Sequence, residues 1–243
     1  MSDRIILIPT YNEAGNVAEL HSAIRAVCDF DLLFIDDSSP DGTSDAVREI
    51  ASRDPGTILL ERPAKEGLGR AYTDGFRSVA ANPGWSRVFM MDADLSHQPC
   101  HIPDMDRALD GCGFVIGSRY IEGVSVLNWS LARLNLSWGA NSYIRFLTGM
   151  PYSDCTSGFR AFRSGLLPLL ASGGIRASGY AWLVETLYRV WMSGASVEEV
   201  PIVFVERTRG SSKVSARVFL ESMAVPVRLG ISRLFVSRPR RER

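Results

Sequence analysis

The stretch RVFMMDAD, residues 87–94, runs four apolar residues directly into two aspartates, Asp92 and Asp94. A short apolar run of this kind is typical of a buried strand, yet this one ends in two negative charges. Similar strands are predicted at RIILIP (4–9), FDLLFIDD (30–37), TILLE (57–61) and FVIGSR (114–119). Because strands that are apolar throughout and alternate with helices form sheets covered on both faces, the sequence predicts an α/β fold with a mainly parallel sheet.

Apolar residues at helical spacing fill the connections between these strands. Helices are predicted at about 17–27, 44–51, 67–80, 134–147 and 180–192, a late strand at 197–207 and a last helix at 214–235. In parallel sheets, ligands bind beyond the carboxyl ends of the strands. Four of the predicted strands end in polar or charged residues. We therefore expect the functional site along the edge of the sheet formed by these carboxyl ends, which we call the rim.

Composition narrows the class of protein. Apolar residues make up 46% and charged residues 22% of 243 residues, which is typical of a globular domain, and the zero formal charge gives no reason to expect a nucleic-acid partner. Four scattered cysteines without a CxxC pair favour reduced thiols. No signal peptide and no apolar run of roughly 18–20 residues is recognisable, so we expect a cytoplasmic chain without a transmembrane helix.

Asp92 and Asp94 predict a divalent-cation site. Residues two apart in a strand point to the same side. Two carboxylates held close together resist joint ionisation, and a cation removes that conflict. Hard oxygen ligands suit Mg²⁺ or Mn²⁺, which keep positions that substrate phosphates fill. The alternative is that Asp94 caps a following helix while Asp92 is solvated.

Asp36 and Asp37 form a second acidic strand end, followed by SSPDGT. Such carboxylates can accept hydrogen bonds from the base or ribose of a nucleotide. The alternative is a turn, which the residues at 38–42 favour. The segment KEGLGRA (65–71) lacks the spacing of a P-loop, so its glycines are interpreted as allowing close backbone approach before a helix.

Basic residues predict the complementary anion site. Arg119 ends the fifth strand, Arg133 and Ser137 lie one helical turn apart, and Arg207 and Lys213 lie in the loop after the late strand. Guanidinium groups pair bidentately with phosphate oxygens, although surface charge is the alternative for each arginine.

A zinc site is a further alternative, because His97, Cys100 and His101 lie close together in the sequence. The cluster offers three ligands where four are normally needed, and Pro99 interrupts it. The pattern therefore disfavours zinc.

Six motifs occur in order along nearly the whole chain: IPTYNE, DDSSPDGT, MDADLSHQP, GSRY, SGFR and VERTRGSSK. In these motifs the chain resembles the glycosyltransferase family 2 enzymes, and within them the polyprenol- (dolichol-) phosphate mannose synthases. The combination of DDSSPDGT, MDADLSH and RTRGSSK is specific to that branch. The resemblance implies a Rossmann-like glycosyltransferase-A fold and inverting transfer of mannose from GDP-mannose to a polyprenyl monophosphate, giving polyprenyl-phosphate mannose.

The resemblance also implies roles for individual residues. The donor would be held by Pro9, Tyr11, Glu13, Ile35, Asp37, Asp92, Ala93, Asp94, Arg207 and Lys213. The acceptor phosphate would be bound by Arg119, Arg133 and Ser137, and Asp92, Asp94 and Arg119 are the expected catalytic residues. The metal ligands would be Asp94, Asp92 and Ser96. Some relatives carry Gln where Ser96 stands, and because serine reaches less far, a water is expected in its place.

The chemistry implied needs no general base, because a phosphate monoester is already anionic at neutral pH. One alternative keeps the lipid acceptor but uses another sugar nucleotide such as UDP-glucose. A second is transfer to a sugar hydroxyl, for which Glu185 or Asp154 would be the candidate base. A third is a catalytically idle nucleotide-binding subunit of a membrane complex.

The segment 214–243 is interpreted as a membrane-interface element appended to a catalytic domain at 1–213. On a helical wheel, Arg217, Glu221, Arg228 and Ser232 share one face, and the remaining face is mostly apolar, including Val218, Phe219, Val225, Leu229 and Leu234. Pro226 is expected to kink this helix. The tail SRPRRER suits anionic headgroups. We expect peripheral association with the cytoplasmic face of a membrane; the alternative is a helix packed on the domain, with a separate membrane protein as partner.

Overall fold

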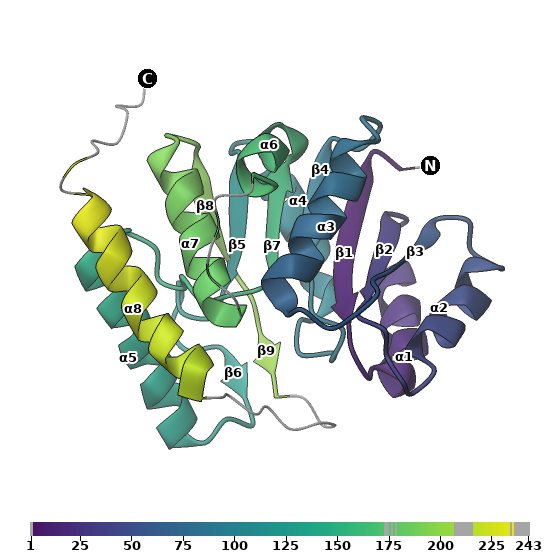
Figure 1. Cartoon of the computed structure of the whole chain (residues 1–243), viewed down its shortest axis with the longest axis horizontal. Coiled ribbons are helices and arrows are strands. Elements are labelled where there is room, and N and C mark those ends of the chain that lie inside the picture. The colour runs from purple at the N-terminus through teal and green to yellow at the C-terminus, as the bar shows by residue number, and fades with distance from the viewer. Residues whose placement is uncertain are drawn as a thin grey trace.

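The computed structural model describes residues 2–172, 175, 177, 179–206, 216–233 and 235. Its centre is a seven-stranded sheet in the order β3-β2-β1-β4-β7-β5-β8, with a second, two-stranded sheet of β6 and β9 (Figure 1). The strands are β1 (Arg4–Thr10), β2 (Asp31–Asp36), β3 (Thr57–Glu61), β4 (Arg87–Met90), β5 (Phe114–Ser118), β6 (Val126–Leu127), β7 (Arg160–Arg163), β8 (Val197–Pro201) and β9 (Phe204–Val205). All neighbours in the large sheet pair in parallel except β7, which is antiparallel to β4 and β5.

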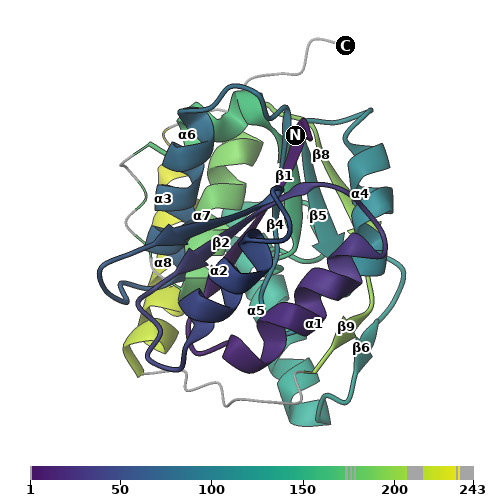
Figure 2. The same cartoon turned by 90° about the vertical axis from the view of Figure 1, so that its right-hand side faces the viewer.

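Helices cover both faces of this sheet. They are α1 (Ala14–Arg25), α2 (Thr43–Ala51), α3 (Leu68–Ala80), α4 (Ile102–Ala108), α5 (Leu131–Thr148), α6 (Leu167–Leu170), α7 (Gly179–Met192) and α8 (Ala216–Arg233), with single 3₁₀ turns at Pro99–His101 and Ser164–Leu166. Figure 2 shows the sheet between α3 and α7 on one side and α1 and α4 on the other. The mainly parallel α/β architecture is therefore as predicted.

The alternation of side chains along β1 shows how the two layers arise. Ile5 and Leu7 belong to the core cluster under α3 and α7, whereas Ile6 and Ile8 belong to the cluster under α1, α2 and α4. Successive side chains of a strand point to opposite faces. Since both faces are covered, every one of these positions is apolar, which is the pattern read from the sequence.

Two predicted strands are shorter than expected. The fourth ends at Met90 rather than Asp94, because the Asp92 N–H donates to the ring of His97 at 3.0 Å instead of continuing the ladder. The late strand is divided into β8 and β9. Pro201, the last residue of β8, has no N–H to donate, and the chain then leaves the large sheet to pair with β6.

The helices α5 and α8 form a layer beside α7 at one end of the sheet (Figure 1). Tyr143 Oη donates to Met223 O at 2.9 Å, and Gly230 lies directly against the backbone of Leu147. The second contact lies further along both helices than the first, so the two helices run in the same direction. A side chain at Gly230 would meet Leu147 O at 2.6 Å, so this close approach requires glycine.

The predicted faces of α8 are only partly as expected. Val225 and Leu229 are apolar as predicted but lie buried in the core, and the predicted polar residue Arg228 forms an ion pair with Glu185 of α7 at 2.7 Å. The exposed side instead carries Leu220, Val227 and Ile231. The side chains of residues 216–219, and residues 234 and 236–243, lie outside the described part. Within the part of the chain that is described, no helix is long and apolar enough to cross a membrane.

Candidate active site

The carboxyl ends of β1, β2, β4 and β5 carry most of the predicted site residues, so the parallel ladders bring them to one rim. Pro9 of β1 pairs in register with Ile35 of β2, and Leu7 pairs with Met90 of β4. Neighbouring strands in a sheet are about 4.8 Å apart. The tails of these strands, Tyr11 to Glu13, Asp37 and Asp92 to Asp94, therefore start from adjacent positions.

Asp36 and Asp37 have different roles although they are adjacent. Asp36 is fully buried and accepts hydrogen bonds from Thr10 Oγ1 at 3.0 Å, Ser39 N at 2.9 Å and Ser44 Oγ at 2.8 Å. It holds the turn, as the turn alternative predicted. Asp37 is instead buried beside Arg62, with which it forms an ion pair.

Arg62 was not among the residues predicted from the sequence. Its guanidinium also contacts Glu66 and Asp74, each at 2.9 Å. Burial disfavours its charge, but the carboxylates of Asp37 and Asp74 hold the pKa of Arg62 above its ordinary value. Its position directly after β3 could have identified it, because polar residues at the ends of the other strands were predicted to be functional.

Tyr11 and Glu13 lie on the loop after β1. The ammonium of Lys65 stands 3.5 Å from the centroid of the Tyr11 ring, in a cation–π contact. Glu13 precedes α1 and accepts a hydrogen bond from Asn16 Nδ2 at 2.6 Å. The loop lies against the start of α2, because the Glu13 N–H donates to Thr43 Oγ1 at 3.0 Å.

Three predicted donor residues are placed less directly. The Ile35 side chain is fully buried under α3, where an added Cβ on Gly75 would meet Ile35 Cδ1 at 2.5 Å. Ile35 therefore presents no side chain at the rim. Ala93 is also buried, between the partly exposed Asp92 and Asp94. Pro9 is partly buried in β1.

In the loop after β4, Ser96 contacts Asp94 and His97 contacts Asp92. Ser96 donates to Asp94 Oδ1 from its backbone N–H at 3.1 Å and from its hydroxyl at 2.5 Å. His97 accepts from Asp92 N through Nδ1, and its Nε2 lies 3.7 Å from Asp92 Oδ2. Leu95 makes the turn between them with φ of +62°, a conformation that non-glycine residues seldom adopt.

The carboxylates of Asp92 and Asp94 are ligands that fit a hard divalent cation. Among the described residues there is no group of three or more His, Cys, Asp or Glu side chains that could hold a metal. Mg²⁺ and Mn²⁺ sites of nucleotide-binding enzymes often have only one or two protein carboxylates, and phosphate oxygens and waters complete them. The zinc alternative is not supported, since His97 faces Asp92 and His101 Nε2 instead accepts the Val203 N–H at 2.9 Å.

Arg119 is held at the end of β5 by Asp154. Its Nε and Nη2 donate to the two carboxylate oxygens, each at 2.6 Å, and Nη2 also reaches Thr156 Oγ1 at 2.8 Å. Asp154 is completely buried. Burial opposes its ionisation, but the charge and hydrogen bonds of Arg119 leave the pKa of Asp154 below its ordinary value. The bidentate pair therefore fixes the guanidinium plane.

The other two predicted acceptor residues, Arg133 and Ser137, lie near Arg119 and are connected to it by the side chains of Trp129 and Tyr120. The guanidinium carbons of Arg119 and Arg133 lie 5.5 Å and 4.3 Å from the Trp129 ring centroid. Ser137 accepts a hydrogen bond from Tyr120 Oη at 2.8 Å, and Tyr120 follows Arg119 directly. The structure thus brings together three residues that are up to 18 positions apart in sequence, counting from the numbers 119 and 137. Arg133 also forms an ion pair with Glu206.

Two groups of predicted residues remain: the late-loop residues Arg207 and Lys213, and the candidate bases Asp154 and Glu185. Arg207 and Lys213 lie outside the described residues. The two candidate bases for a hydroxyl acceptor are both engaged by arginines: Asp154 by Arg119, and Glu185 by Arg189 and Arg228. Since a general base must be able to accept a proton from the substrate, neither geometry supports that role.

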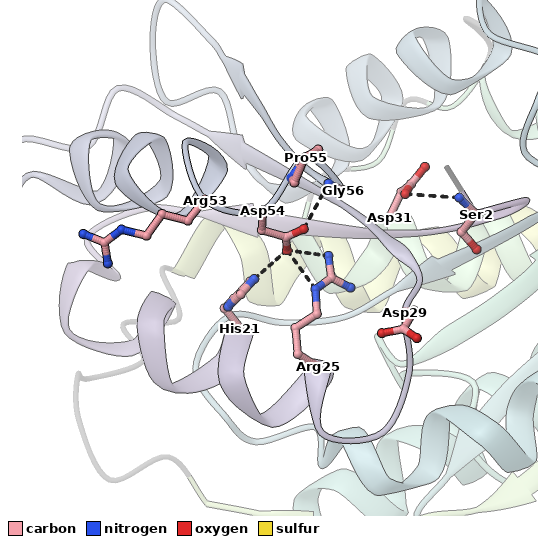
Figure 3. A pocket seen from close by; sticks show the side chains of 9 residues that line it. All are labelled: Ser2, His21, Arg25, Asp29, Asp31, Arg53, Asp54, Pro55 and Gly56. Atoms are coloured by element: carbon pink, nitrogen blue, oxygen red, sulfur yellow. Dashed lines mark hydrogen bonds and ion pairs between the residues drawn. The ribbon is translucent and has the colours of Figure 1, made fainter.

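A cavity of about 490 Å³ lies elsewhere, at the amino ends of β2 and β3 (Figure 3). Three of its side chains form one cluster: His21 Nε2 lies 2.8 Å and Arg25 Nη2 2.7 Å from Asp54 Oδ2. Asp31 accepts from Trp85 Nε1 at 2.8 Å. Ligands of parallel sheets bind at the opposite ends of the strands, so this cavity is not the candidate active site.

Comparison with known proteins identifies the family. The family model for glycosyl transferase family 2 matches residues 5–168. The chain belongs to this family. The protein is therefore a glycosyltransferase, and the rim of carboxylates and arginines is the candidate active site of a family 2 enzyme.

Two curated relatives of this glycosyltransferase are similar over nearly their full length. The undecaprenyl-phosphate mannosyltransferase of Micrococcus luteus is 38% identical over 94% of this chain and 94% of its own. The polyprenol monophosphomannose synthase of Mycolicibacterium smegmatis is 39% identical over 93% of this chain and 86% of its own. These names agree with the branch that the motifs resemble.

Solved structures agree on the fold. A mannosyltransferase from Pyrobaculum calidifontis, in complex with GDP-Man and Mn²⁺, is 18% identical, with a TM-score of 0.58 over 96% of this chain and 74% of its own. Glucosyl-3-phosphoglycerate synthase from Mycobacterium tuberculosis, in complex with Mn²⁺ and UDP, is 19% identical, with a TM-score of 0.59 over 98% and 81%. The fold is thus of the glycosyltransferase-A type, as predicted.

Proposed function

We propose that this glycosyltransferase transfers mannose, with inversion, from GDP-mannose to a polyprenyl monophosphate, and that it requires Mg²⁺ or Mn²⁺. The observation that carries the proposal is the meeting of the Asp92–Asp94 pair and the Arg119–Arg133–Ser137 group on one rim, in a chain whose two full-length relatives bear names of that activity.

In this proposal, Asp94 and Asp92 hold the cation, with Ser96 holding the Asp94 carboxylate in place. A bound cation would neutralise the charge that develops on the β-phosphate of the departing nucleotide. Asp37, Tyr11 and Glu13 hold the nucleoside, with Pro9, Ile35 and Ala93 contributing through the backbone, and Arg207 and Lys213 hold the donor from the late loop. The Mn²⁺ and GDP-Man in the Pyrobaculum structure support this choice of donor and metal.

Arg119, Arg133 and Ser137 bind the acceptor phosphate. Two anionic groups must approach each other for the sugar to pass between them, so fixed cations on the acceptor side reduce their repulsion. The acceptor oxygen is already deprotonated at neutral pH, because the second pKa of a phosphate monoester is about 6. The arginine-bound state of Asp154 and Glu185 supports a mechanism without a general base.

A different donor remains the second candidate, with UDP-glucose and the same lipid acceptor. It is favoured by the UDP in the complex of the Mycobacterium tuberculosis structure. Such a change would alter the base and sugar contacts and leave the roles of Asp92, Asp94 and Arg119 intact.

We propose further that α5 and α8 place the active site against the cytoplasmic face of a membrane, extending the role predicted for residues 214–243. α5 exposes Leu131, Trp138 and Phe146, and α8 exposes Leu220, Val227 and Ile231. We call these six residues the two-helix surface. Exposed apolar side chains in such numbers mark interaction sites.

Charge and position favour a lipid surface as the occupant. α5 carries two arginines and no acidic residue, and α8 carries three arginines and one glutamate, which suits anionic headgroups. The same helix α5 that exposes Trp138 also supplies Arg133 and Ser137 to the acceptor site. A helix lying in the interface with its apolar side chains inserted would therefore present the acceptor residues to a lipid phosphate.

The function is tested by incubating the purified protein with a short polyprenyl phosphate and radiolabelled GDP-mannose or UDP-glucose, with and without EDTA. We expect label to enter the lipid phase from GDP-mannose only, and only with the metal present. Transfer from UDP-glucose alone would replace the donor. Transfer that persists in EDTA would contradict the role given to Asp92 and Asp94.

A further inference from the structure

Asp92 is contacted by one side chain at two points. The His97 ring accepts the Asp92 backbone N–H through Nδ1 at 3.0 Å, and its other nitrogen, Nε2, lies 3.7 Å from Asp92 Oδ2. The imidazole therefore spans from the backbone of Asp92 to its carboxylate. No motif in the sequence assigned His97 a role beyond the disfavoured zinc cluster.

The backbone contact fixes the tautomer of His97. A nitrogen that accepts an N–H carries no proton itself, so the proton of the neutral ring is on Nε2. The His97 side chain is buried, so this hydrogen bond is shielded from water. The Nε2–H consequently faces the Asp92 carboxylate.

The His97 ring has little freedom to turn. It stacks on Phe159, with centroids 5.0 Å apart and planes at 18°, and meets Phe204 edge-on at 5.6 Å. A Cβ added to Gly158 would lie 3.4 Å from His97 Cε1 and 3.6 Å from both Asp92 carboxylate oxygens. The backbone at Gly158 thus packs against the ring and the carboxylate together. A side chain held on this many sides can define the orientation of a neighbour.

We propose that His97 is a positioning residue, which fixes the rotamer of Asp92 so that its carboxylate faces the divalent-cation site. The inference rests on the proposed function, because it takes Asp92 as a metal ligand. In this proposal, Ser96 and His97 have corresponding roles: Ser96 orients Asp94 through its hydroxyl, and His97 orients Asp92 through its ring. Outer partners of metal ligands commonly change metal affinity by about 10–100-fold when removed.

The test measures Mn²⁺ binding by electron paramagnetic resonance, in the presence of GDP and without any sugar or acceptor. His97→Phe retains a ring against Phe159 but removes both nitrogens, and we expect Mn²⁺ affinity to fall about tenfold or more. His97→Asn can still accept the Asp92 N–H and is expected to lose less. His101→Phe is the matched control, because it also removes an imidazole that accepts a backbone N–H, that of Val203, and should leave Mn²⁺ affinity unchanged.

Thermal unfolding of each variant separates positioning from general stability. If His97→Phe folds and binds Mn²⁺ as tightly as the wild type, the positioning role is overturned. If His97→Phe does not fold, His97→Asn decides: it should bind Mn²⁺ more weakly than the wild type, by up to about tenfold, and unchanged affinity overturns the proposal. A wild type that binds no Mn²⁺ would overturn the metal site itself. Neither a sugar nor an acceptor enters this measurement, and repeating it with UDP in place of GDP covers the second candidate donor, so an error in those parts of the proposed function leaves the result intact.

Discussion

Replacing Trp138 and Phe146 by serine should detach the protein from anionic membranes. Both side chains project from α5, 58% and 85% exposed, and Leu131 of the same helix is 77% exposed. At 100° per residue, the three positions lie within about 80° of one another on the helix surface. They form one stripe, so a membrane that receives one of them receives the others.

The expected loss follows from the exposed areas. An aromatic side chain presents roughly 200 Å², so the exposed fractions correspond to about 120 Å² for Trp138 and about 170 Å² for Phe146. Complete transfer from water at about 25 cal/mol per Å² would contribute about 7 kcal/mol. A helix lying at headgroup level inserts only part of this area. Taking about half, the double variant should lose about 3.5 kcal/mol, roughly 300-fold in partition coefficient.

The assay is co-sedimentation with vesicles containing phosphatidylglycerol, at increasing lipid concentration. Val27→Ser is the control, because Val27 is an exposed apolar residue beyond α1, away from the two-helix surface. Turnover of a short, water-soluble acceptor phosphate should be unchanged in the double variant. Equal sedimentation of the double variant and the wild type would refute the reasoning. A wild-type dimer that the double variant converts to a monomer would instead assign the surface to a second copy.

Three further predictions concern the rim, the cavity at the amino ends of β2 and β3, and the core. Arg119→Ala should reduce turnover of a soluble acceptor about 100-fold and, by leaving the buried Asp154 unpaired, lower the free energy of unfolding in urea by about 3–5 kcal/mol; unchanged turnover would remove Arg119 from the acceptor site. The pKa of Asp54 is lowered: burial opposes its ionisation, but hydrogen bonds from His21 and other neighbours outweigh that effect. Its ion pairs therefore stabilise the fold above about pH 4 and are lost as the pH falls below that value, so Asp54→Asn should flatten the acid limb of a stability–pH curve, and an unchanged limb would contradict this. Gly75→Ala places a Cβ 2.5 Å from Ile35 Cδ1 and should cost about 1–3 kcal/mol in urea unfolding, whereas Gly139→Ala, with open space around it, should not destabilise the protein.

Local periodicity was enough to predict the parallel core. The apolar runs at 4–9, 57–61 and 114–119 became β1, β3 and β5 with bounds shifted by at most one residue. Burial of the strand interior leaves few polar positions there, so the apolar run is easy to recognise. The antiparallel insertion of β7 was not predicted in detail, because the pairing direction of a single short strand depends on the strands around it.

The prediction of which face of α8 is exposed was wrong for Val225 and Leu229 for a related reason. A helical wheel shows which residues share a face, but it does not show which face meets the protein. Val225 and Leu229 were expected on the lipid side and lie in the core, while Leu220 and Ile231 are exposed. The role of α5 could not be seen either, because its exposed stripe matters only where α5 and α8 lie together.

The sequence by itself determined the strand–helix alternation, the rim on which charged residues collect, and the family. Only the tertiary structure decided the partner of each charge: Arg62 for Asp37, 25 residues away, Asp154 for Arg119, 35 residues away, and the His97 ring for Asp92. The physical reason is the distance along the sequence over which each property is set. Side-chain periodicity follows from the geometry of a few consecutive residues, whereas an ion pair or a stacked ring depends on which strands become neighbours and on how closely the backbone between them can pack.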